Sequence, residues 1–127
     1  MIYELRIYTC IPGRLPALLK RFETKTLDIW KKHGIRPAGF WTVLIGEGNN
    51  DLHYLLAWES LAEREQKWTA FQADPAWHAA RNESERDGLI IANISYITGT
   101  ASNQAILDVY AGERGAPIFI PRSAGRG

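Results

Sequence analysis

The sequence predicts one α+β domain, built from a four-stranded antiparallel sheet with two helices packed on one of its faces. Two observations support this fold class. Segments with the two-residue alternation of strands lie on either side of segments with helical periodicity, and their order along the chain is strand, helix, strand, strand, helix, strand. The length of 127 residues is also typical of one domain with one core.

The first predicted strand covers residues 2–9, which are rich in β-branched, aromatic and aliphatic side chains. Pro12 and Gly13 follow it and indicate a turn. Alternation places Tyr3, Leu5 and Ile7 on one face and Glu4, Arg6 and Tyr8 on the other. Glu4 and Arg6 are therefore neighbours, and their charges must form a pair if both faces of the sheet are buried.

The clearest predicted helix covers residues 14–33. Pro16 stands in its first turn, where the missing N–H costs little, and Gly34 suits the left-handed residue that ends a helix. His33 lies in the last turn, where a cation interacts favourably with the helix dipole. The buried face is formed by Leu15, Leu18, Leu19, Phe22, Thr26, Ile29, Trp30 and His33.

The middle of the chain predicts an antiparallel hairpin. Residues 38–46 are apolar on both faces, which indicates a strand covered on both sides. The turn-forming residues 48–51 join them to a second strand over residues 52–59.

A second helical region follows the hairpin. Ser60 and Glu63 have the spacing of a capping box. The helix is expected to end near Gln72 and to begin again at Asp74-Pro75, with Asp74 as the N-cap. Residues 89–98 predict the last strand.

This order of elements favours a ferredoxin-like β-α-β-β-α-β protomer with both helices on one face. The other face would then be uncovered, although this region carries apolar and aromatic side chains, namely Tyr8, Phe40, Trp41, Val43, Leu44 and Trp58. We therefore expect a homodimer in which two sheets close face to face. Helical cover from the C-terminal tail is the alternative.

Composition excludes several classes of protein. The formal net charge is +1, from 15 basic and 14 acidic residues, so neither nucleic acid nor a membrane surface is an expected partner. Cys10 is the only cysteine and forms no intrachain disulfide. No signal peptide and no membrane span is recognisable, and we expect a cytoplasmic protein. Residues 1–98 are expected to form the domain, and residues 99–127 a partly ordered extension.

Several segments carry a family resemblance when taken together and in order. They are Tyr3–Thr9, Pro12–Leu15, Lys31–Gly34, Gly39–Trp41, Trp58–Arg64 and Asp74–Trp77. With these segments the chain resembles the NIPSNAP family over about residues 1–98. The resemblance implies a ferredoxin-like protomer in a dimeric α/β barrel. It implies no single reaction, because related barrels include cofactor-independent monooxygenases, haem-degrading enzymes, muconolactone isomerases and binding proteins.

His78 is the candidate catalytic residue. It follows the predicted helix break at Asp74-Pro75, where an imidazole could act as a general base; the alternative is a partly exposed helix histidine. Candidate substrate-binding residues are Arg6 and Tyr8 on the first strand. Resemblance to cofactor-independent oxygenases of related fold, whose cavities are lined by tryptophan, asparagine and histidine or tyrosine, adds Trp58, Trp77 and Asn93. For the Glu4–Arg6 pair, a structural role competes with orientation of a carboxylate or phenolate ligand.

Three functions follow from these residues. The first is a dimer that binds a small hydrophobic or aromatic metabolite, with cofactor-independent oxygenase or isomerase activity as its enzymatic form. The second is a non-catalytic interaction protein, as in animal relatives, that docks through residues 118–120. The third is a haem-handling barrel with His78 or His53 as axial ligand. We expect no cofactor and no metal, because His33, His53 and His78 lack metal-ligand spacing.

Overall fold

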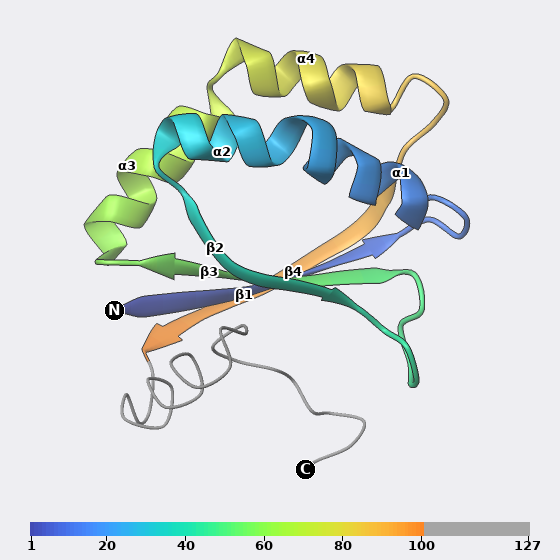
Figure 1. Cartoon of the computed structure of the whole chain (residues 1–127), viewed down its shortest axis with the longest axis horizontal. Coiled ribbons are helices and arrows are strands. Elements are labelled where there is room, and N and C mark those ends of the chain that lie inside the picture. Colours follow the sequence, from blue (N-terminus) through green and yellow to red (C-terminus); the bar gives the residue numbers. More distant parts are fainter. Residues whose placement is uncertain (101–127) are drawn as a thin grey trace.

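The first residues form β1 (Ile2–Cys10), which lies inside the sheet. The computed structural model describes residues 1–100, and Figure 1 shows their arrangement. The strand order is β2-β3-β1-β4, and every pair is antiparallel. The other strands are β2 (Arg36–Thr42), β3 (Asp51–Trp58) and β4 (Ile91–Thr100). This confirms the predicted ferredoxin-like sheet. The part of the predicted extension that follows Thr100 lies outside the described residues.

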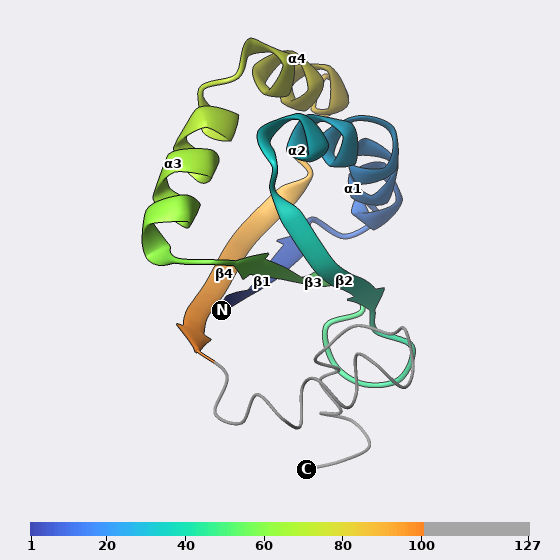
Figure 2. The ribbon, with the colours of Figure 1, turned by 60° about the vertical axis from the view of Figure 1, so that its left-hand side comes forward.

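All the helices of residues 1–100 lie on one face of the sheet, and two views agree on this (Figures 1 and 2). They are α1 (Leu15–Arg21), η1 (Phe22–Thr26), α2 (Leu27–His33), α3 (Leu61–Gln72) and α4 (Pro75–Ser84). The helix layer and the helix-facing side of the sheet enclose the core.

The predicted helix over residues 14–33 contains a π-helical segment, η1, that the periodicity did not reveal. The Leu27 N–H donates to the Phe22 carbonyl, five residues earlier. A π turn holds more residues than an α turn, so side chains four apart (Leu18, Phe22, Thr26 and Trp30) all stay buried against the sheet. Gly34 ends α2 with φ 72°, in the left-handed conformation predicted for it.

The second predicted strand is shorter at its C-terminal end than expected. Pairing between β2 and β3 ends at Thr42 and Leu52, so residues 43–46 have no strand partner there. Leu44 and Ile45 extend from the sheet and are exposed. An apolar run alone therefore overestimated the strand, because a strand also needs a hydrogen-bonding neighbour.

Polar side chains cap the N-termini of α3 and α4, as predicted. The Ser60 hydroxyl accepts a hydrogen bond from the Glu63 N–H at 3.0 Å, and the Glu63 carboxylate accepts one from the Glu59 N–H at 2.9 Å. Asp74 caps α4 by accepting the Ala76 N–H at 2.8 Å. Its other oxygen lies 2.7 Å from His33 Nε2, so the start of α4 is tied to the end of α2.

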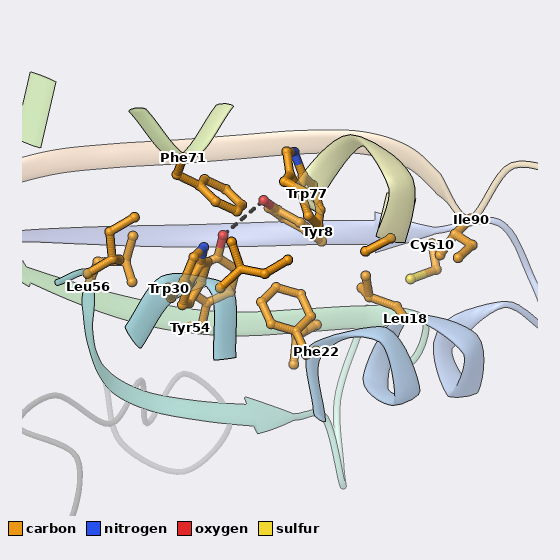
Figure 3. Close-up of a cluster of buried hydrophobic side chains, with 14 of the residues drawn as sticks. Tyr8, Cys10, Leu18, Phe22, Trp30, Tyr54, Leu56, Phe71, Trp77 and Ile90 are labelled. Carbon is orange, nitrogen blue, oxygen red and sulfur yellow. Dashed lines mark hydrogen bonds between the residues drawn. The ribbon is translucent and has the colours of Figure 1, made fainter. Parts of the chain in front are cut away.

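The core is largely aromatic, as the close-up in Figure 3 shows. The Phe22 ring lies 5.4 Å from each of the Trp30 and Tyr54 rings. Tyr8 and Trp58 face this helix-covered core. The prediction that they lie on the open face of the sheet was wrong. The open face instead carries the alternate residues of β1, namely Tyr3, Leu5 and Ile7, which are half-buried.

Candidate functional site

A group of charged and aromatic side chains lies between the sheet and the helices, around the middle of β1. We call it the Arg6 cluster. It comprises Glu4, Arg6 and Tyr8 of β1, Tyr54 and Trp58 of β3, Arg64 and Trp68 of α3, and Tyr96 of β4. Strand register brings it together, because Arg6 is paired with Tyr54 on one side and with Tyr96 on the other.

The Glu4 carboxylate is the anionic end of the cluster and is fully buried. It accepts a 2.7 Å bond from Arg6 Nη1 and a 3.0 Å bond from Trp58 Nε1. Arg64 donates two further bonds, of 2.7 and 3.1 Å. Burial alone would raise the pKa of Glu4, but the two guanidinium groups outweigh it and hold the pKa below its usual value. Glu4 is therefore ionised near neutral pH.

The Arg6 guanidinium is the centre of the cluster. Its Nε donates to the Tyr54 hydroxyl at 2.8 Å, and its Nη2 makes a long 3.4 Å contact with the Tyr8 hydroxyl. Its central carbon lies 4.6 Å from the Trp68 ring centre and 5.0 Å from that of Tyr96, within cation–π range. Burial lowers the pKa of Arg6, but the neighbouring phenols and Glu4 raise it above its usual value.

Two tyrosines continue the network from Arg6. The Tyr54 hydroxyl accepts from Arg6 Nε and donates to the Tyr8 hydroxyl at 2.9 Å, the bond dashed in Figure 3. Burial raises the pKa of Tyr54 well above its usual value, so this phenol stays protonated. Within residues 1–100, the Tyr8 hydroxyl proton has no acceptor. The chain of donors from Arg6 therefore ends in an unused O–H.

The cluster reaches solvent on the β4 side. Ile94 and Tyr96 lie on the same side of the sheet as Tyr8 and Arg6, with which they are paired. Both are nevertheless exposed, Tyr96 by 58%. The helix layer covers β1 but leaves the side chains of β4 accessible. Arg6 and Tyr8 themselves are only 6% and 8% exposed.

The structure brings three of the predicted site residues together: Arg6, Tyr8 and Trp58. Trp77 lies in α4, where its ring is 4.8 Å from that of Phe71. His78 is exposed on α4, and its Nε2 lies 2.6 Å from the Gln72 carbonyl oxygen. The roles assigned to Trp77 and His78 stay predictions.

Sequence reasoning missed Tyr54, Arg64, Trp68 and Tyr96 as members of the site. Tyr54 and Tyr96 could have been found by pairing the predicted strands around Arg6. Arg64 and Trp68 depend on how α3 packs on the sheet, which has no local sequence signal.

The remaining histidines lie outside the cluster. His53 is on the open face of the sheet, where its ring stacks 5.8 Å from the Trp41 ring. Burial lowers the pKa of His53. In the described part of the chain, no group of three or more His, Cys, Asp or Glu side chains is placed to hold a metal ion. No helix among residues 1–100 is long and apolar enough to cross a membrane.

Comparison with known proteins gives one family. The model of the NIPSNAP family matches residues 3–101. A crystal structure of a NIPSNAP family protein of unknown function from Agrobacterium tumefaciens is 29% identical, with a TM-score of 0.70, and the match covers 80% of this chain and 87% of that one. An uncharacterized NIPSNAP domain protein from Burkholderia xenovorans is 22% identical, with a TM-score of 0.69 and coverage of 80% and 95%. No curated protein matches.

The fold extends beyond this family. A putative antibiotic biosynthesis monooxygenase from Nitrosomonas europaea has a TM-score of 0.56 at 6% identity, with coverage of 81% of this chain and 100% of that one. At that identity the likeness shows a shared fold only.

Proposed function

This chain belongs to the NIPSNAP family, and on that premise we propose that its Arg6 cluster binds a small aromatic or other hydrophobic metabolite through an acidic oxygen. One observation carries the proposal: the donor chain from Arg6 ends in the unused O–H of Tyr8, while the same Arg6 guanidinium lies 5.0 Å from the centre of the exposed Tyr96 ring. Sites for such ligands are usually apolar, with a few converging polar groups.

The chemistry of the cluster favours a phenolate, enolate or carboxylate. Arg6 supplies a permanent positive charge in a region of low dielectric, where charge interactions are stronger than in water. Tyr8 supplies a hydrogen bond that Arg6 and Tyr54 polarise. Aromatic rings at Trp68 and Tyr96 suit a flat apolar body.

Stabilisation of an anionic oxygen is also what a cofactor-independent oxygenase or isomerase requires when it removes a proton next to a carbonyl. The protein would act as such an enzyme if a base reached the bound ligand. His78 is the proposed base, and the binding proposal does not depend on it. A change of His78 to glutamine separates the two, since it would abolish turnover and leave binding intact.

The test uses 4-nitrophenol, whose yellow phenolate form is measured by absorbance. Wild-type protein should bind it and raise its phenolate fraction at constant pH. Tyr8→Phe should weaken binding by about tenfold, the value of one hydrogen bond to a charged group, and should reduce the absorbance change.

Tyr3→Phe is the matched control, because Tyr3 is on the same strand but on the open face. It should bind like the wild type. Equal binding by Tyr8→Phe and the wild type, or no binding of the probe by folded wild-type protein, would contradict the proposal.

We also propose that two copies associate through the open face of the sheet. This face carries the half-buried Tyr3, Leu5 and Ile7 and the side chain of Ile97, which is 72% exposed. Ile97→Lys should lower the mass in sedimentation equilibrium from dimer to monomer. Leu89→Lys is the control, because it changes a similarly exposed apolar residue that precedes β4. The Leu89→Lys protein should remain dimeric. A monomeric wild type would refute the proposal.

A further inference from the structure

A groove of about 350 Å³ lies between α4 and the helix made of α1 and η1. Figures 1 and 2 show α4 running beside this helix at the outer side of the helix layer. The charged residues that line the groove are Arg14, Lys20, Arg21, Lys25, Glu83 and Asp87. None of them belongs to the Arg6 cluster.

Arg21 is the unusual member of this lining. Its side chain is only 4% exposed, yet its Nε has no hydrogen-bond partner. Nη1 donates to the Ser84 hydroxyl at 3.2 Å, and the guanidinium carbon lies 5.1 Å from the Trp77 ring centre. Among residues 1–100, no carboxylate is within ion-pair distance of Arg21. A buried charge without an anionic partner is unfavourable in a folded protein.

The charges around Arg21 also leave its guanidinium without full compensation. Burial lowers its pKa, and the charge of Glu85 opposes that shift without forming an ion pair. Arg81 lowers the pKa further. The positive charge at Arg21 is thus only partly compensated by its protein neighbours.

Local backbone structure holds Arg21 in this position. It is the last residue of α1, and the π segment η1 begins immediately after it. The Thr26 hydroxyl donates to the Arg21 carbonyl at 3.4 Å, and the Thr24 hydroxyl donates to the Lys20 carbonyl at 2.7 Å. π segments inside α-helices are frequent at functional sites.

The groove as a whole has an excess of positive charge. Four basic side chains and two carboxylates line it, which leaves a surplus of two positive charges. Arg14 is held by three carbonyl oxygens, those of Ser84, Gly88 and Leu89, and not by a carboxylate. The Glu83 carboxylate also forms an ion pair with Arg86, in which Oε2 lies 3.1 Å from Nη1. This surplus matches the charge of a phosphate monoester near neutral pH, about −2.

We propose that this groove binds the phosphate group of a small metabolite, with the Arg21 guanidinium as its anchor. Arg21 lines the groove, and its guanidinium donates to a phosphate oxygen, as guanidinium groups commonly do. Lys20 and Lys25 contribute charge at the rim. The volume of the groove suits a small molecule, and the site is separate from the one proposed at Arg6.

The test observes the arginine Nε–H resonances of ¹⁵N-labelled protein by NMR, and Arg21→Met identifies the Arg21 signal. Inorganic phosphate is added at constant ionic strength. We expect the Arg21 Nε–H signal to move and saturate, together with the backbone amides of Thr24 and Ser84. Acetate, a monoanion, should produce a much smaller change.

Variants then measure the contribution of Arg21. In Arg21→Met, the amide shifts of Thr24 and Ser84 should require about tenfold more phosphate, as for loss of a hydrogen bond to a charged group. Lys31→Ala removes an exposed charge on α2 outside the groove and should bind like the wild type. If Arg21→Met does not fold, the double variant Lys20→Ala, Lys25→Ala should weaken binding several-fold. An immobile Arg21 Nε–H signal, or equal responses to acetate and phosphate, would overturn the proposal.

Discussion

Replacing Glu4 by glutamine gives the sharpest test of the energetics of the Arg6 cluster. Glutamine keeps the size of the side chain but removes the charge that Arg6 and Arg64 share. Removing one partner of a buried ion pair costs about 3–5 kcal/mol. Arg64 is 24% exposed and can turn to water, so we expect a loss of about 3 kcal/mol, or roughly 12 °C in Tm for a domain of this size.

The assay is urea unfolding followed by tryptophan fluorescence, with the protein concentration held constant because association would add stability. The midpoint should fall while the m-value stays unchanged. Glu65→Gln makes the same change at an exposed position of α3 and should have little effect. A loss below about 1 kcal/mol in Glu4→Gln, against the range for buried pairs, would refute the reasoning.

A double variant shows whether the loss of stability in Glu4→Gln comes from an unpaired charge or from a loss of packing. Glu4→Leu with Arg6→Met removes the two buried charges and keeps apolar volume, while Arg64, which is 24% exposed, can turn to water. Replacing a buried ion pair by apolar residues is often neutral or stabilising. We therefore expect the double variant to be more stable than Glu4→Gln. If it is less stable, packing and not charge determines the effect.

The pH dependence has a defined sign. The pKa of Glu4 is lower in the folded state than in the unfolded chain, where a glutamate titrates near about 4.3. The contribution of Glu4 to stability is thus complete above the unfolded pKa and is lost as the pH falls through the folded pKa. The stability difference between wild type and Glu4→Gln should shrink below about pH 4. If the stability difference between the two proteins does not change with pH, the conclusion that Glu4 is ionised in the folded state is wrong.

Two further predictions concern positions outside the cluster. Ser60→Ala removes the hydroxyl that accepts the Glu63 N–H and should cost about 1 kcal/mol in urea unfolding, whereas Thr69→Ala, at an exposed position inside α3, should not. The Cys10 thiol is buried and burial raises its pKa, so Ellman's reagent should react slowly with native protein and fast in urea; rapid reaction of native protein would show that the end of β1 opens easily.

Much of the fold followed from local patterns. The alternation in residues 2–9, the apolar stripe of residues 15–33 and the caps at Ser60 and Asp74 each act over a few residues. Short-range sterics and hydrogen bonding determine such features. They were confirmed except at Leu19, which was predicted in the buried stripe but is 38% exposed. The Glu4–Arg6 pair was also foreseeable, because two residues on one strand face are neighbours whatever the fold. The face-to-face dimer stays a prediction.

The errors came from features that depend on partners distant in sequence. Residues 43–46 look like a strand, but β3 offers them no hydrogen-bonding neighbour. The side of the sheet on which Tyr8 and Trp58 lie depends on which face the helices cover, and alternation gives only the division into two faces. The π turn after Arg21 is a small change in helical winding that no residue type marks.

For the candidate site, the sequence by itself determined that Glu4, Arg6 and Tyr8 share one face of a strand, because side chains alternate with a period of two. Only the tertiary structure decided what meets them there. Register with β3 and β4 adds Tyr54 and Tyr96, and the packing of α3 adds Arg64 and Trp68. Arg21 likewise became notable only when α4 buried it without a carboxylate. Local sterics belong to the sequence segment itself, whereas burial and charge compensation depend on every element that packs around it.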